Sequence, residues 1–223
     1  MPWRFHRIWI VAVLLVSGLA LAWLIAKTPL PQPAATMQPV ATPTPDLTGS
    51  AIYTNGPYGF AITYPERAVV ADAFASAHLP SSWRVNAIGE GNPIVSITTY
   101  ATASEHAYPR HFEAVVRIGA STDVREVREC LRPTADRGET ALPDATFGGA
   151  TWKVFSFGDA GMQRYVRGES YRTVHEGACV AIERITAGSR YREGAHPDDV
   201  SEAVLEDAYG ALDQVVKSFV FAR

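Results

Sequence analysis

The chain has 223 residues, with 20 basic and 23 acidic side chains and a formal net charge of −3. Nucleic-acid binding normally needs a clustered basic face, so this balance argues against DNA or RNA as a partner. The sequence contains only two cysteines, and they are not arranged as C-x-x-C, which excludes the common redox motif.

The first feature along the chain is an apolar run without a charged side chain, residues 8–26. A helix of this length, at about 1.5 Å per residue, reaches roughly 28 Å, close to the thickness of a bilayer core. Arg4 and Arg7 precede the run and only Lys27 follows it directly. Because basic residues favour the cytoplasmic side, we expect residues 1–7 inside and the remainder outside.

We therefore predict a single-pass anchor in the inner (plasma) membrane, with the membrane itself as partner of residues 8–26. The alternative is a cleaved secretory signal, since Ala20, Leu21 and Ala22 form an A-x-A site after an apolar region. Both interpretations place the following domain in the periplasm or extracytoplasmic space.

Residues 28–50 are rich in proline and nearly free of charge, which is typical of a linker. Proline-rich chain favours an extended conformation of about 3.1 Å per residue, although an unstructured spacer of no fixed length is the alternative. Residues 51–223 are then enough for one domain with a single hydrophobic core.

Cys130 and Cys179 are expected to form a disulfide in an oxidising compartment. The bridge would close a loop of 49 residues. The alternative is a pair of buried, reduced thiols that act as small apolar residues.

Runs of β-branched and aromatic residues predict strands, bounded by glycine and proline. The expected strands are residues 59–64, 93–100, 113–118, 152–157, 165–176 and 178–186, with a tight turn at Glu176 and Gly177.

Two helices are predicted. Asp123 and Glu126 have the spacing of a capping box, with Val124, Val127 and Leu131 on one face of the helix that follows. A final helix follows His196 and Pro197. Its apolar face is expected to carry Val204, Ala208, Leu212, Val215 and Phe219. This order of elements predicts an α+β fold, in which helices cover an antiparallel sheet.

Both ends of this domain resemble PsbP-like domains. Residues 53–65, YTNGPYGFAITYP, are similar to the opening turn and first strand of that family, and residues 211–221, ALDQVVKSFVF, to its last helix and strand. The resemblance implies an α-β-α sandwich around a central antiparallel sheet and a non-enzymatic accessory role. It transfers no metal-binding or partner-binding residue, since no family binding motif is matched.

Known catalytic patterns are absent from the sequence. Gly168–Arg172 contains a serine but lacks the closing glycine of a nucleophile elbow, and residues 175–179 lack the second histidine of a zinc helix. We therefore assign no catalytic residue, metal ligand or cofactor. A metal-dependent envelope hydrolase would need His106, His111 or His175 to converge in a cleft.

Tyrosine and arginine gather in the later strands, and these two residue types often anchor protein interfaces. The candidate interface with an envelope protein consists of Arg164, Tyr165, Arg167, Tyr171, Arg172, Arg190, Tyr191 and Arg192. Alternatively, the tyrosines face the core and the arginines pair with Glu169, Glu176, Glu183 and Glu193. From sequence, the expected function is a membrane-tethered, non-enzymatic binding module, with the hydrolase as the alternative.

Overall fold

The computed structural model describes residues 49–74, 76, 79–102, 112–161, 164–189 and 200–222. The predicted anchor at residues 8–26 lies outside these ranges, as do nearly all of the linker, His106, His111, Arg190, Tyr191 and Arg192. Within the described ranges, no helix combines the length and apolar character needed to cross a membrane.

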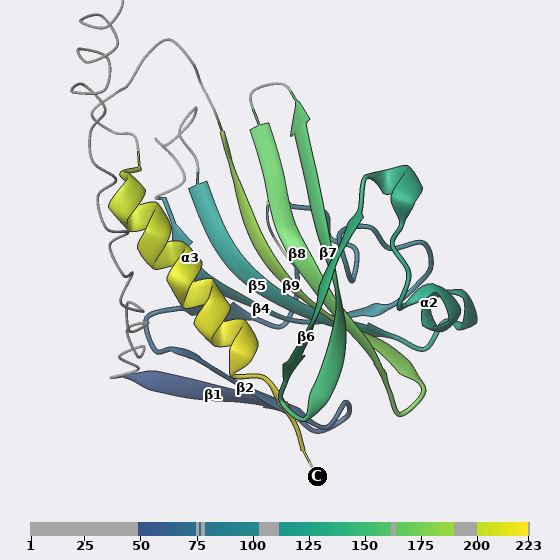
Figure 1. The fold of residues 1–223 in the computed structure, drawn as a ribbon. Coiled ribbons are helices and arrows are strands. Elements are labelled where there is room, and N and C mark those ends of the chain that lie inside the picture. The colour runs from purple at the N-terminus through teal and green to yellow at the C-terminus, as the bar shows by residue number, and fades with distance from the viewer. Residues whose placement is uncertain are drawn as a thin grey trace, which may run out of the picture. The chain divides into compact units, whose positions relative to one another are not determined.

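Two antiparallel sheets make up the domain (Figure 1). The larger sheet has seven strands in the order β3-β4-β5-β9-β8-β7-β6, and the smaller has the order β1-β2-β10. The strands are β1 (Ser50–Asn55), β2 (Phe60–Pro65), β3 (Val69–Ala71), β4 (Asn92–Ala101), β5 (Phe112–Ser121), β6 (Thr140–Phe147), β7 (Ala150–Gly161), β8 (Arg164–His175), β9 (Ala178–Ser189) and β10 (Val220–Phe221).

The centre of the large sheet is covered on both faces. All ten residues of β5 are buried, and β9 is buried along nearly its whole length. Side chains alternate between faces along a strand, so one face of these strands carries Val116, Ile118 and Ile182, and the other carries Val115 and Ile185. The two faces therefore hold separate parts of the core.

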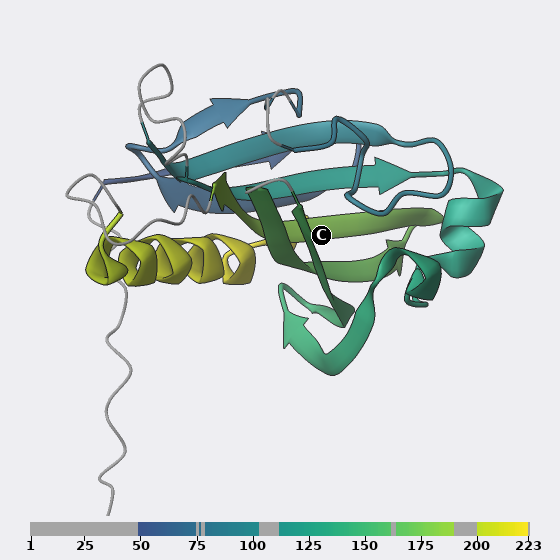
Figure 2. The same cartoon turned by 90° about the horizontal axis from the view of Figure 1, so that it is seen from above.

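One face is covered by the long helix α3 (Glu202–Lys217), which runs along one side of the sheet (Figure 2). Ser201 caps the helix, because its side chain accepts a hydrogen bond from the Val204 N–H. Ala208, Leu212 and Val215 are buried against the sheet, as the spacing predicts. Phe219, which was expected to continue this helical face, follows the helix and is also buried.

On the opposite face, the described residues form no long helix. It is covered by the irregular segment between β3 and β4, the short helix α2 (Val124–Glu129) and the 3-10 turn η1 (Ala135–Arg137). Trp83 from that segment packs with Cys130, Cys179 and Ala181. The α+β prediction is confirmed, while this layer is built mainly from irregular chain rather than helix.

The start of α2 was predicted correctly but its buried face was not. Asp123 accepts hydrogen bonds from the N–H groups of Arg125 and Glu126, as an N-cap should. However, Val124 and Leu131 are 80% and 45% exposed, whereas Glu126 is fully buried. The Glu126 carboxylate does not close a capping box. It forms hydrogen bonds in the interior of the domain instead.

The predicted strands are all present, with ends that differ by up to four residues. The turn at Glu176 and Gly177 is confirmed, since both residues have positive φ angles, of 48° and 79°. The sequence analysis did not identify β1, β3 or β6. All three lie toward an edge of their sheets, where burial is incomplete and the apolar pattern is weak.

The predicted disulfide is confirmed. Cys130 follows α2 directly and joins Cys179, near the start of β9, with their Cα atoms 5.7 Å apart. The disulfide therefore links the end of α2 to β9, a central strand of the large sheet.

Replacing both cysteines by alanine is expected to lower the free energy of unfolding by about 4 kcal/mol, because the unfolded chain regains the freedom of a long loop. Guanidinium unfolding of the parent and the C130A/C179A variant measures this difference. Adding a reductant should lower the stability of the parent alone. Equal stabilities without reductant would contradict the stabilising role of the bridge.

Candidate functional site

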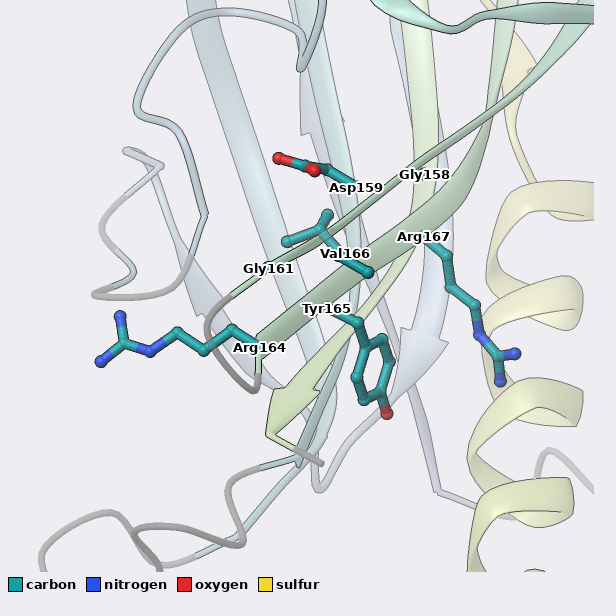
Figure 3. Close-up of a pocket in the computed structure, with 8 residues that line it drawn as sticks. Gly158, Asp159, Gly161, Arg164, Tyr165, Val166 and Arg167 are labelled. Atoms are coloured by element: carbon teal, nitrogen blue, oxygen red, sulfur yellow. The ribbon is translucent and has the colours of Figure 1, made fainter. Parts of the chain in front are cut away.

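A hollow lies at the free end of the β7–β8 hairpin (Figure 3). It has a volume of about 450 Å³, within the range of small-ligand sites. We call it the hairpin hollow, and its lining consists of Gly158, Asp159, Ala160, Gly161, Arg164, Tyr165, Val166 and Arg167. The site therefore contains two runs of four consecutive residues, one from each strand.

The hollow forms where β7 loses its outer neighbour. Pairing between β6 and β7 begins at Thr140 and Ser156, so no described strand pairs with the outer side of β7 beyond Ser156. The free part of β7 carries small residues, because Gly158 and Gly161 have no side chain and Ala160 has only a methyl group. Open space is left where larger side chains would otherwise project.

A second hollow of about 300 Å³ lies beside the first. Its lining consists of Pro80, Val85, Asn86, Arg137, Phe157, Gly158, Asp159 and Val166. The two hollows share Gly158, Asp159 and Val166. Together they follow the free edge of β7, with the irregular segment on one side.

The side chains of the hairpin hollow divide between the two faces of the sheet. Figure 3 shows Asp159 and Val166 on one side, and Tyr165 and Arg167 on the other. Asp159 and Arg164 are exposed, and neither forms an ion pair with another described residue. Their charges are therefore available to a ligand at the rim.

Arg167 is held by the helix instead of projecting freely. Its guanidinium lies 5.3 Å from the centre of the Tyr209 ring and donates a hydrogen bond to the Tyr209 hydroxyl. Its Nε also donates to the Thr186 hydroxyl at 3.4 Å. Arg167 thus fixes the wall of the hollow nearest α3, while Arg164 remains unconstrained.

The structure divides the predicted interface. Arg164, Tyr165 and Arg167 line the hollow together, and Arg190, Tyr191 and Arg192 lie outside the described residues. Tyr171 and Arg172 are buried, so their inclusion in an exposed interface was wrong. Contact of the other residues with a partner stays a prediction.

Tyr171 instead follows the alternative interpretation. Its hydroxyl donates a hydrogen bond to Glu169 at 2.5 Å, and burial followed by this hydrogen bond raises its pKa above the ordinary range. Glu169 also pairs with Arg184 at 3.0 Å. The polar groups of Tyr171, Glu169 and Arg184 therefore bind one another within the domain.

Arg172 belongs to a buried charged network under the irregular segment. Glu139 accepts hydrogen bonds from Arg172, from the Asn86 amide at 3.1 Å and from the Thr134 N–H at 2.7 Å. Burial alone raises the pKa of Glu139, but these bonds and the attraction of Arg172 outweigh it, so its pKa is lowered. Glu139 is therefore held in its charged form.

Arg84 and Glu126 extend this network to α2. Arg84 Nη2 lies 2.8 Å from Glu126 Oε2, and both side chains are almost completely buried. Glu126 Oε1 accepts the N–H groups of Ile88 and Gly89, each at 2.6 Å. The Glu126 carboxylate thus binds both the Arg84 side chain and the backbone at Ile88 and Gly89. These contacts hold the irregular segment in place.

Neither of the described residues considered for hydrolysis is arranged for it. The buried Ser170 hydroxyl accepts a hydrogen bond from Arg172 Nε at 2.9 Å. The His175 ring stacks on Phe221 with ring centres 3.7 Å apart, at the opposite end of β8 from the hollow. Among the described residues, no group of three or more histidine, cysteine or acidic side chains could hold a metal ion.

The sequence analysis missed Gly158, Asp159, Ala160 and Gly161. A signal was present, since these small and polar residues directly follow the predicted strand at 152–157. Glycines and a charged residue directly after a predicted strand indicate that the strand continues but is no longer buried.

We expect Glu126→Gln to lower the free energy of unfolding by about 3 kcal/mol, since it removes the nearer of the two carboxylates that pair with the buried Arg84. Chemical unfolding measures the loss. Glu129→Gln is the matched control on the same helix, because Glu129 pairs with Arg128 and Arg132 at the surface. Equal effects of the two substitutions would contradict the structural importance of the buried pair.

We also expect the stability of the domain to depend on pH through Glu183. Glu183 is buried and accepts the Val85 N–H at 2.8 Å, and burial raises its pKa although Arg117 attracts the charged form. Its contribution to stability is fully present below the pKa of the unfolded chain, and is lost as the pH rises through the raised folded value.

Glu183→Gln removes this titration, so the variant should gain stability relative to the parent between about pH 4 and about pH 8. Unfolding of both proteins at the two pH values gives the comparison. A stability difference that does not change with pH would show that the pKa of Glu183 is not raised in the folded protein.

No family model and no curated protein matches the chain. Among solved structures, it is similar to the solution structure of cyanobacterial PsbP (CyanoP) from Synechocystis sp. PCC 6803, with a TM-score of 0.37 and 12% identity over 85% of this chain and 99% of that chain. It is also similar to the crystal structure of LpqN, involved in cell envelope biogenesis of Mycobacterium tuberculosis, with a TM-score of 0.35 and 11% identity over 78% of this chain and 85% of that chain. A PsbP protein is therefore among the solved structures to which this chain is similar.

Proposed function

We propose that the protein is a membrane-tethered, extracytoplasmic binding module that presents the hairpin hollow to a partner in the cell envelope. The observation that carries the proposal is an exposed hollow at a strand edge that no described strand pairs with, and Arg164 at its rim has no described ion-pair partner. Its lining combines apolar surface with a few polar groups, which is the usual character of a recognition site.

The location rests on two independent features. A disulfide between Cys130 and Cys179 suits an oxidising compartment outside the cytoplasm. The uncharged run at residues 8–26, followed by the proline-rich residues 28–50, suits a tether that holds a domain away from the membrane. Such a tether gives a binding domain reach without needing a second anchor.

A non-enzymatic role is favoured by the way the interior uses its polar groups. Arg84, Arg172, Glu126 and Glu139 pair with one another under the irregular segment. The described residues that line the hollow include no serine, cysteine or histidine. Nucleophilic catalysis needs a nucleophile within reach of a base, so we propose recognition rather than hydrolysis.

Photo-crosslinking in intact cells tests this proposal. A benzoylphenylalanine at position 160 lies in the hollow, and one at position 124 lies on the exposed start of α2 as the control. We expect a discrete adduct from position 160 that position 124 does not give. Adding Arg164→Glu should reduce the yield of that adduct, because the rim charge is reversed.

The absence of an adduct from position 160, or the same adducts from both positions, would contradict a binding site at the hollow. An adduct that is unchanged by Arg164→Glu would remove the arginine from the recognition surface. Purified membranes should retain the full-length chain if residues 8–26 act as the tether.

A further inference from the structure

We propose that the partner of the hairpin hollow is an extended, acidic segment of another polypeptide, which pairs with the free edge of β7 as an added strand. This inference rests on the proposed function and names the class of partner for the same site.

The hollow surrounds an edge and not one face of the sheet. Successive side chains of a strand point to opposite faces, so a depression in one face is lined by alternate residues. Here residues 158–161 all contribute, and Figure 3 shows their neighbours on β8 pointing to both sides. The open space therefore lies where a further strand would be added.

The backbone of the edge points outward at Gly158 and Ala160. A Cβ atom built on Gly158 would lie 3.9 Å from Arg167 Cβ, its partner in the register. Such a short separation is typical of the antiparallel pair that exchanges no hydrogen bonds. The N–H and C=O groups of Gly158 consequently point away from β8, and those of Ala160, two residues on, do the same.

Space and reach also suit an added strand. Among the described residues, a Cβ on Gly161 would meet nothing within 4 Å, so no described side chain separates an incoming segment from Arg164, which pairs with Gly161 in the register. An added strand would lie two strand spacings, about 9.6 Å, from β8, with β7 between them. An Asp or Glu side chain of the incoming segment that extends back over Gly161 would therefore meet the Arg164 side chain extending toward it. Main-chain bonds would supply affinity, and Arg164 would select for charge.

Charge decides between possible occupants. Arg164 and Arg137 line the two hollows and Asp159 is the one acidic lining residue, so the described rim attracts carboxylates. A second copy would bring two sets of these arginines together, which is unfavourable. The proline-rich residues 28–50 of the same chain lack many of the N–H groups that strand pairing requires.

The test uses the full-length chain in detergent micelles and a phage-displayed library of random dodecapeptides. We expect enriched peptides to be rich in Asp and Glu and free of proline in their central residues. The affinity of an enriched peptide, measured by fluorescence anisotropy, should fall at least about tenfold in Ala160→Pro, which removes an outward N–H. Arg164→Glu should give a similar loss that shrinks at high salt.

Matched controls lie on α2, at the end of the sheet opposite the free hairpin end (Figure 1). Val124→Pro introduces proline at the first position of a helix, where it is tolerated, and Arg125→Glu reverses an exposed charge. Neither should change peptide affinity by more than about twofold. If Ala160→Pro fails to fold, the pair of charge variants and amide exchange at Ala160 decide, since strand addition must slow exchange of that amide.

Several outcomes would overturn strand addition: no enrichment, peptides that bind Ala160→Pro as tightly as the parent, or unchanged exchange at Ala160. A parent dimer abolished by Ala160→Pro would identify a second copy as the occupant. Enrichment only after deletion of residues 28–45 would identify the chain's own linker. If crosslinking from position 160 succeeds while the peptide arms fail, the binding module stands and strand addition falls.

Discussion

The buried pairing of Glu139 with Arg172 and of Glu126 with Arg84 is the interaction on which one whole side of the domain depends. Within the part of the chain that the structure describes, no long helix covers that face of the large sheet, so the irregular segment between β3 and β4 must be fixed in another way. Arg84 reaches both carboxylates, at 2.8 Å from Glu126 and 3.8 Å from Glu139. Buried charges of this kind bind specific positions together, although their net contribution to stability is modest.

This network also determines where the candidate site lies. Asn86 donates to Glu139, and both Asn86 and Val85 line the second hollow beside the free edge of β7. The irregular segment therefore forms one side of the second hollow, and the edge strand β7 forms the other side. The position of the site therefore depends on the buried network. The Glu139 carboxylate, which binds Arg172, also positions Asn86, which lines the second hollow.

Much of the fold could be predicted from local pattern, and the errors have identifiable causes. Central strands such as β5 and β9 are rich in apolar and β-branched residues, while β6 was missed because its exposed edge carries little apolar signal. The helix start at Asp123 was recognisable from capping chemistry. The role of Glu126 was not, since a buried carboxylate and an exposed one look alike in sequence.

Part of the error along β8 was avoidable. Along β8, Tyr165, Arg167 and Tyr171 have odd numbers and share the α3 face, whereas Arg164 and Arg172 lie on the other. Treating all of them as one surface ignored the twofold alternation of strands. The sequence could not show which even-numbered arginine is covered, because the cover is an irregular segment without periodicity. Only the tertiary contacts of Glu139 distinguish the interior Arg172 from the exposed Arg164.

An exposed strand edge must avoid indiscriminate pairing, and the residues at the hollow explain how this one does so. The free part of β7 is only about five residues long, contains two glycines and carries the charged Asp159, features that oppose aggregation between edges. The same features leave room for an incoming backbone and place one arginine beside it. Protection against wrong partners and recognition of a particular one therefore arise from a single short stretch of sequence.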